Sequence, residues 1–199
     1  RYSTDASVYQ IKPLGVVLPK DTNDVLNLME YSQKNSVPLL ARGGGSSQCG
    51  QTVGESVVLD YSKHQNKILE LNVEEKYVWV QPGVVLDHLN DYLKPHGLWF
   101  PVDVSTSSRA TIGGMSANNS CGSRSLYYGN MVHNVLAIEA ILDDGSIFNF
   151  DQINKNYLAT KNNQDRLYKI IDKFIDVRQK VGSEINTNWP TTQRRVGGY

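Results

Sequence analysis

The segment ARGGGSSQCGQ, residues 41–51, places four glycines and two serines directly after the apolar run Val37–Leu40. Glycine can adopt positive φ and lets a backbone come close to a ligand, and successive amides of such a loop can surround an anion. The segment therefore has two interpretations. It is either an ordinary turn after a buried strand or a loop shaped so that a phosphate can approach its amides.

The residues around this loop predict a βαβ unit. Gly15–Leu18, Pro38–Ala41 and Ser56–Asp60 are typical of short strands, and a helix is expected between the first two. The run Asp21-Thr22-Asn23-Asp24 offers side-chain oxygens that can cap the start of that helix, and the apolar residues at 25, 28 and 29 follow helical spacing. The glycine loop then lies at the carboxyl end of a strand, which is where open α/β sheets tend to bind ligands.

The remaining pattern predicts two hairpins and two helices. The expected elements are paired strands Ile68–Asn72 and Tyr77–Gln81, a helix over Val85–Leu93, paired strands Val135–Leu142 and Ile147–Phe150, and a helix over Leu167–Val181. Asp143-Asp144-Gly145 predicts the second hairpin turn. Residues 101–128 are rich in Ser, Thr, Gly and Asn and show almost no periodicity. We interpret Trp79, Tyr92 and Trp99 as core residues.

Residues 108–114 and 118–129 are two further glycine-bearing segments. No standard nucleotide signature accompanies them. The P-loop pattern G-x-x-x-x-G-K-[ST] does not occur, and G-x-G-x-x-G fails because Gln48 stands where its third glycine should be. Each segment alone is weak evidence, but two long glycine-bearing loops beside predicted strands favour a ligand.

Composition excludes several classes of function. The formal net charge is zero and the pI about 7.1, which argues against nucleic acid or an anionic membrane surface as partner. The four histidines lack metal-ligand spacing, so no metal is expected. No apolar run is long enough to span a membrane. Cys49 and Cys121 are interpreted as reduced thiols, which predicts a cytoplasmic protein; attachment to the inner face of a membrane stays open.

Four quoted segments in fixed order carry a family resemblance: ARGGGSSQCGQ (41–51), VQPGVVLDHLN (80–90), FPVDVSTSSRATIGGMSANNSCGSRSLYYG (100–129) and DDG (143–145). The chain resembles the PCMH-type FAD-binding domain of the vanillyl-alcohol oxidase superfamily. The branch is the one with the glycolate oxidase flavin subunit and the D-lactate and D-2-hydroxyglutarate dehydrogenases. The resemblance implies an α+β (α/β-like) fold of two lobes, residues 10–75 and 76–199.

The resemblance also implies a site. Its first loop would wrap the FAD diphosphate, and later segments would line the flavin, the ribityl chain and the adenine. The residues implied are Arg42, Gly43, Gly44, Gly45, Ser46, Ser47, Gly50, Gln51, Pro101, Asp103, Ser105, Thr111, Gly113, Gly114, Asn118, Ser120, Gly122 and Ile138. Some relatives attach FAD through a histidine in the first loop. That position reads Gly45 or Ser46 here, so FAD is expected to bind without a covalent link.

The implied activity is hydride transfer from a 2-hydroxy acid to flavin N5. Residues 1–19 resemble the opening of long family members, and RRVGGY (194–199) resembles the point where the FAD domain hands over to a cap domain. The chain is therefore expected to be a fragment, inactive without a cap domain that binds the substrate, and no catalytic residue is assigned. An iron–sulfur cluster would belong only to a missing C-terminal domain, and the electron acceptor is open. The alternative is a non-catalytic module that binds a phosphate or nucleotide ligand.

Overall fold

The structure is a computed structural model of the chain that describes residues 1–151, 166–192 and 195. The chain divides into two compact units, Arg1–Val135 and the described part of Leu136–Arg195, and each is taken by itself. The division expected at residue 75 does not coincide with this one and stays a prediction, as does the role of residues 194–199, which the structure describes only at Arg195. None of the described helices is long and apolar enough to cross a membrane.

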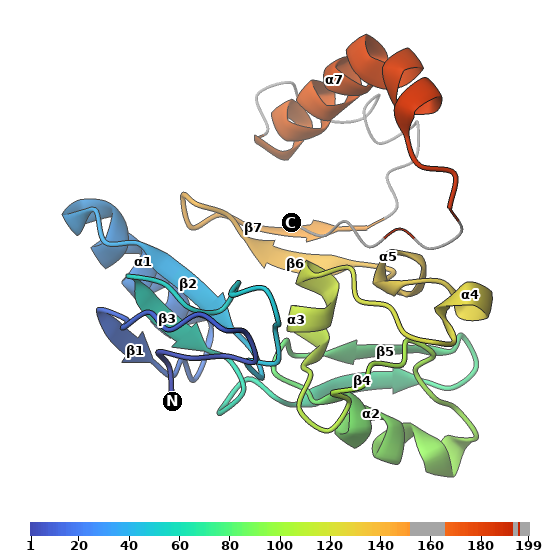
Figure 1. The fold of residues 1–199 in the computed structure, drawn as a ribbon, viewed down its shortest axis with the longest axis horizontal. Coiled ribbons are helices and arrows are strands. Elements are labelled where there is room, and N and C mark those ends of the chain that lie inside the picture. Colours follow the sequence, from blue (N-terminus) through green and yellow to red (C-terminus); the bar gives the residue numbers. More distant parts are fainter. Residues whose placement is uncertain (152–165, 193–194, 196–199) are drawn as a thin grey trace. The chain divides into compact units, whose positions relative to one another are not determined.

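The first unit opens with the predicted βαβ arrangement. Strand β1 (Gly15–Val17), helix α1 (Thr22–Asn35), strand β2 (Leu39–Arg42) and strand β3 (Val57–Asp60) follow one another (Figure 1). β3 lies between β1 and β2 and pairs with both in parallel. Of the four residues expected to offer the cap, Asp21 caps α1, because its carboxylate accepts a hydrogen bond from the Asp24 amide at 3.1 Å. The glycine loop therefore begins at the carboxyl end of β2, as expected.

A hairpin and a helix form the next part of this unit. β4 (Ile68–Asn72) and β5 (Tyr77–Val80) pair antiparallel as expected, and α2 (Leu86–Leu93) follows, continued by the short 3-10 helix η1 (Lys94–His96). The buried residues Val84, Leu89 and Leu93 pack against apolar side chains of the hairpin. Removal of this apolar surface from water holds α2 on the hairpin.

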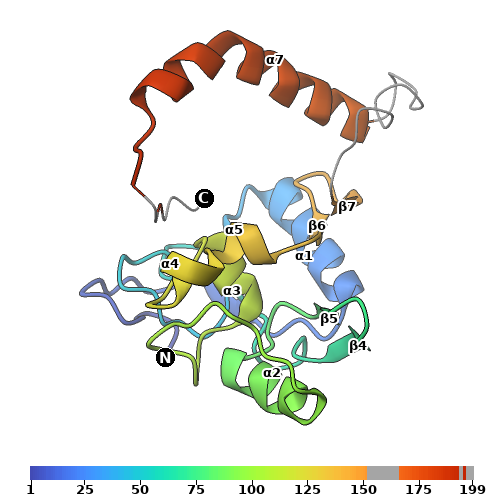
Figure 2. The same ribbon diagram turned by 90° about the vertical axis from the view of Figure 1, so that its right-hand side faces the viewer.

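Three short helices occupy the stretch in which the sequence shows no periodicity. They are α3 (Ile112–Ala117), α4 (Ser125–Tyr128) and α5 (Met131–Asn134), and Figures 1 and 2 show α3 and α5 side by side. Met115 of α3 and Met131 of α5 belong to one buried cluster with Leu86, Val102 and Ala110. The stretch is thus ordered through its core contacts, although helices of four to six residues are too short to show a helical period.

The core assignment of two aromatic residues was wrong. Tyr92 and Trp99 are 45% and 41% exposed, whereas Trp79 is partly buried. Trp99 lies edge-on to Tyr128, with ring centroids 5.1 Å apart, and the Arg124 guanidinium lies over its ring. An aromatic–cation cluster on the surface explains its position better than apolar burial does.

The second unit holds a hairpin and a long helix. β6 (Ile138–Ile141) and β7 (Ile147–Phe150) pair antiparallel, and Gly145 makes the turn between them with φ of 81°, as the Asp-Asp-Gly motif predicts. Helix α7 (Arg166–Asn188), seen along its length in Figure 2, extends beyond the expected range. Arg166 at its start pairs with Asp143, at 2.6 Å, and with Asp144, which ties the helix to the hairpin turn.

Candidate functional site

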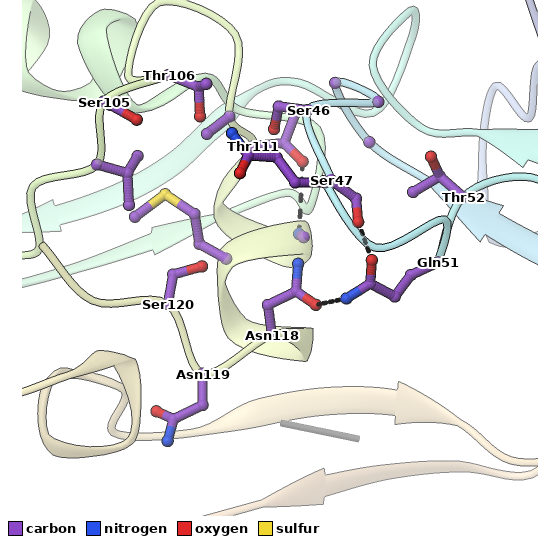
Figure 3. A pocket seen from close by; sticks show the side chains of 18 of the residues that line it. Ser46, Ser47, Gln51, Thr52, Ser105, Thr106, Thr111, Asn118, Asn119 and Ser120 are labelled. Atoms are coloured by element: carbon purple, nitrogen blue, oxygen red, sulfur yellow. Dashed lines mark hydrogen bonds between the residues drawn. The ribbon is translucent and has the colours of Figure 1, made fainter. Parts of the chain in front are cut away.

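A pocket of about 390 Å³ lies in the first unit between the glycine loop and the start of α3 (Figure 3). This volume falls in the range of roughly 300–1,000 Å³ that is usual for ligand pockets. Many of the residues expected at the cofactor line it: Gly43, Gly44, Gly45, Ser46, Ser47, Gln51, Ser105, Thr111, Gly114, Asn118 and Ser120. The fold therefore gathers into one cavity residues that are up to 77 positions apart, from Gly43 to Ser120.

The first wall is the loop that follows β2. Among the described residues, the backbone amides of residues 43–48 donate no hydrogen bond to a protein group; the donors resume at Cys49, whose amide reaches Ser47 Oγ at 3.4 Å. A row of amides without protein partners beside a cavity can receive an acceptor such as a phosphate oxygen. This geometry favours the second of the two interpretations of the glycine loop.

The second wall is α3 and the chain that leads to it. The buried Thr111 caps α3, with its hydroxyl facing the Gly114 amide at 3.4 Å. Thr111, Gly114, Met115 and Asn118 fall at helical spacing i, i+3, i+4 and i+7, so one face of this short element is turned to the pocket. The second wall therefore combines one face of α3 with the loop residues that flank this helix.

The glycines of the first wall allow the two walls to meet. A Cβ built on Gly43 would overlap Thr111 Oγ1, and one built on Gly44 would overlap the carbonyl oxygen of Arg109. The absence of a side chain at these two positions is thus required by contact between loops, before any ligand is considered. Gly45 differs, since it has φ of 67° and lies against the Arg42 guanidinium.

Side chains also join the walls. The Ser47 hydroxyl donates to Gln51 Oε1, and Gln51 Nε2 donates to Asn118 Oδ1 at 3.4 Å, as the dashed lines in Figure 3 show. Gln51 belongs to the glycine loop, and Asn118 is the C-cap residue that directly follows α3. This hydrogen bond joins the two walls at one edge of the pocket.

The lining carries no charged side chain. The residues that the sequence reasoning missed are also neutral: Gln48, Thr52, Val104, Thr106, Ala110, Met115, Asn119 and Cys121. Met115 could have been found from its helical spacing with Thr111 had α3 been expected. An anion in this pocket would be held by amides and hydroxyls rather than by Lys or Arg, which agrees with a chain of zero net charge.

Seven expected residues lie outside the lining: Arg42, Gly50, Pro101, Asp103, Gly113, Gly122 and Ile138. Two of the glycines serve packing instead. A Cβ on Gly113 would come within 2.6 Å of Pro82 Cβ, and one on Gly122 would overlap the Asp103 carbonyl oxygen. Pro101 lines a separate cavity of about 270 Å³ with Trp99 and Phe100. Ile138 belongs to β6 in the other unit, so its contact with adenine stays a prediction.

Asp103 organises the loop after α3. It accepts hydrogen bonds from the Ser123 hydroxyl at 2.6 Å and from the Arg124 amide at 3.0 Å. Burial by itself would raise the pKa of this carboxyl, but the hydrogen bonds from Ser123 and Arg124 and the Arg124 charge outweigh it and hold the pKa below its usual value. Asp103 therefore stabilises the loop as a carboxylate.

Arg42 is buried, with 8% of its surface exposed, and it is not among the residues that line the pocket. It donates to the carbonyl oxygens of Thr4 and Thr52 at 2.8 and 3.1 Å. Its contacts are those of a residue that holds loops together.

The chain belongs to a family of FAD binding domains, whose model matches residues 13–151. It is similar to D-2-hydroxyglutarate dehydrogenase of Haemophilus influenzae, with 44% identity over 76% of this chain and 15% of that protein. It is also similar to the mitochondrial cytochrome-type D-lactate dehydrogenase of Kluyveromyces lactis, at 40% over 68% of this chain and 24% of that one, and to glycolate oxidase subunit GlcD of Bacillus subtilis, at 35% over 73% and 32%. The chain thus spans about a third or less of these relatives.

Among solved structures, the fold is similar to that of 6-hydroxy-D-nicotine oxidase from Arthrobacter nicotinovorans. The TM-score is 0.67 at 18% identity, over 75% of this chain and 32% of the other. The fold is therefore shared with that oxidase, and it is mixed α/β as expected. FAD is the cofactor that the family implies, and the pocket fits it. The loop amides 43–48 have no hydrogen-bond acceptor within the part of the chain that the structure describes, and the lining contains no histidine for a covalent link.

Proposed function

We propose that the pocket binds FAD and that the chain is the cofactor-binding part of a flavin-dependent oxidoreductase that oxidises a 2-hydroxy acid. The observation that carries the proposal is the row of amides at residues 43–48, which lies along a neutral pocket in a chain that matches the FAD binding domain family. A ligand held in this way needs hydrogen-bond acceptors with negative charge, and the FAD diphosphate supplies them.

The residues of this chain would hold and orient the cofactor. The amides of Gly43, Gly44, Gly45, Ser46 and Ser47 would receive the diphosphate oxygens, and Ser105, Thr111, Gly114, Asn118 and Ser120 would contact the rest of the molecule from the opposite wall. Met115 and Val104 supply apolar surface in the same lining. The protein would thus exclude water from one side of the cofactor and fix its position by hydrogen bonds.

The proposed oxidation of a 2-hydroxy acid is supported by the names of the similar proteins. Bound FAD would supply the acceptor for a hydride from the carbon that bears the hydroxyl group. D-2-hydroxyglutarate, D-lactate and glycolate share that group, and the names of the relatives contain them. This chain offers no charged side chain in the pocket lining to bind a substrate carboxylate. We therefore expect the substrate-binding residues in a cap domain outside this chain.

A titration tests the cofactor. The purified chain should quench FAD fluorescence on binding and retain a flavin spectrum after gel filtration. Acid denaturation should release all of the flavin, because the link is not covalent. ADP and pyrophosphate serve as probes of the alternative, a non-catalytic phosphate-binding module. Binding of ADP at the affinity of FAD would favour that alternative, and absence of FAD binding would overturn the proposal.

The substrate requires a second comparison. D-2-hydroxyglutarate, D-lactate and glycolate should each leave the flavin of this chain oxidised under anaerobic conditions, since no charged side chain lines the pocket to bind a substrate carboxylate. A longer protein that includes the segments present in the relatives should be reduced by at least one of them. Failure of all three 2-hydroxy acids with the longer protein would remove the assignment of the substrate class.

We also propose a cytoplasmic location. Cys49 and Cys121 are both unpaired thiols, as is usual for a protein in a reducing compartment. Fractionation of cells followed by immunodetection of the protein tests this, and recovery from a secreted fraction would contradict it.

A further inference from the structure

Residues 1–12 fold back on themselves beside the glycine loop. Thr4 and Gln10 form an antiparallel bridge, and the Ile11 amide donates to the Ser3 carbonyl oxygen at 2.9 Å. We call this segment the 1–12 hairpin. It lies outside residues 13–151, which the family model matches. Its contacts with the pocket are therefore a feature of this chain that the family match does not describe.

Asp5 of this hairpin holds the far end of the glycine loop. Thr52 Oγ1 donates to Asp5 Oδ2 at 3.0 Å, and the Ser7 amide donates to Asp5 Oδ1 at 2.8 Å. Thr52 lines the pocket, whereas Asp5 does not. A hydrogen bond to an ionised carboxylate is stronger than one between neutral groups, so this contact restrains Thr52 from outside the cavity.

Arg42 closes the loop between its two ends. It is the last residue of β2, and its guanidinium donates both to the Thr52 carbonyl oxygen and to the Thr4 carbonyl oxygen. The guanidinium also lies over the Tyr2 ring, 5.5 Å from its centroid. One buried cation thus joins the beginning of the glycine loop, its end and the 1–12 hairpin.

Two tyrosines of the hairpin complete the contact. The Tyr2 hydroxyl donates to Asp60 Oδ2 at 2.9 Å, and Asp60 ends β3 with only 1% of its surface exposed. Tyr9 lies against Gly50, where φ is 79° and a Cβ would come within 2.6 Å of the ring. The hairpin therefore contacts the loop at Thr52 and Gly50 and the sheet at Asp60.

A loop with four glycines loses more conformational entropy on ordering than other loops of its length. A ligand that must order the loop itself binds more weakly than one that meets an ordered loop. We propose that the 1–12 hairpin orders the glycine loop before the cofactor binds, with Asp5 and Arg42 as positioning residues that act through Thr52. The proposal rests on the FAD site put forward above and names a requirement for it.

A double-mutant cycle in the full chain measures the effect on FAD affinity. Asp5→Ala and Thr52→Val should each weaken FAD binding by roughly tenfold, and the double variant should bind no more weakly than either single one. Thr52→Ser, which keeps the hydroxyl, should bind FAD as the parent does. The matched control is Glu30→Ala, which removes the exposed Glu30–Lys34 ion pair of α1 and should leave the affinity unchanged.

Unchanged FAD affinity in Asp5→Ala would overturn the inference while the FAD site itself stands. Strictly additive losses would also overturn it, because Thr52 would then act on the cofactor without Asp5.

Hydrogen exchange without FAD provides a readout that does not depend on cofactor binding. Asp5→Ala should raise several-fold the exchange of the Cys49 and Val53 amides, which donate to Ser47 Oγ and to the Gly50 carbonyl oxygen, and should leave α2 and the β4–β5 hairpin at the parent rates. Exchange that is unchanged, or raised equally throughout the unit, would contradict a positioning role. If the parent chain failed to bind FAD, the proposed function would fall, and this measurement would still decide whether the hairpin orders the loop.

Discussion

Gln51 and Asn118 meet across the pocket, with Gln51 Nε2 donating to Asn118 Oδ1 at 3.4 Å although the residues lie 67 positions apart. Gln51 is held in turn by the Ser47 hydroxyl. Neutral groups from both walls thus meet at this edge of the pocket. A negative charge introduced here would repel an anion bound by the loop amides.

Asn118→Asp should weaken FAD binding by more than about tenfold, whereas Asn118→Ala should weaken it only a few-fold. Both variants alter the contact with Gln51, but only aspartate adds a negative charge beside the diphosphate. Isothermal titration of each variant with FAD measures the difference. Equal losses in the two variants would show that the diphosphate lies away from Asn118.

Gly44→Ala should lower the free energy of unfolding by about 1–3 kcal/mol even without FAD, because its Cβ would overlap the Arg109 carbonyl oxygen. Urea unfolding of the cofactor-free chain tests this. Gly182→Ala is the matched control, since a Cβ at Gly182 of α7 meets nothing within 4 Å. A Gly44→Ala chain of parent stability that fails to bind FAD would show instead that the glycine serves the ligand.

The strands and longer helices could be predicted because each has its own local signal. Apolar runs mark β1 to β3, and Asp-Asp-Gly marks the turn between β6 and β7. The helices α3 to α5 could not be predicted, because six residues or fewer do not complete enough turns for a period to appear. Tyr92 and Trp99 were wrongly assigned to the core because an aromatic residue does not show in sequence whether its side chain packs against apolar surface or against other groups at the surface, as Trp99 does with Tyr128 and Arg124.

The sequence indicated which segments line the pocket, but it did not show what each of their residues contacts. A glycine in the sequence can indicate that other atoms lie close to the backbone at that position, but it does not show which atoms these are. Gly113 and Gly122 are crowded by Pro82 and Asp103 and lie outside the lining. Arg42 directly precedes the glycines and yet contacts carbonyl oxygens of distant segments. Such contacts depend on the tertiary fold and leave no local pattern.

FAD affinity should change less than about threefold between about 0.05 and 0.5 M salt. The pocket lining contains no charged side chain, so binding through amides and hydroxyls offers few ionic contacts for salt to screen. Fluorescence titrations over a series of sodium chloride concentrations measure the dependence, with ADP as a second ligand. A steep fall with salt would mean that lysine or arginine side chains contact the diphosphate.

Acid should destabilise the parent chain more than an Asp103→Asn chain. The pKa of Asp103 is lowered in the folded state, so its contribution to stability is fully present above the pKa of the unfolded chain. That contribution is lost as the pH falls through the lowered pKa of the folded chain. Asparagine keeps a similar shape but cannot titrate, so the variant should be less stable at neutral pH and its stability should depend less on pH. Urea unfolding across the acid range compares the two chains, and parallel curves would show that Asp103 gains nothing from Ser123 and Arg124 as a carboxylate.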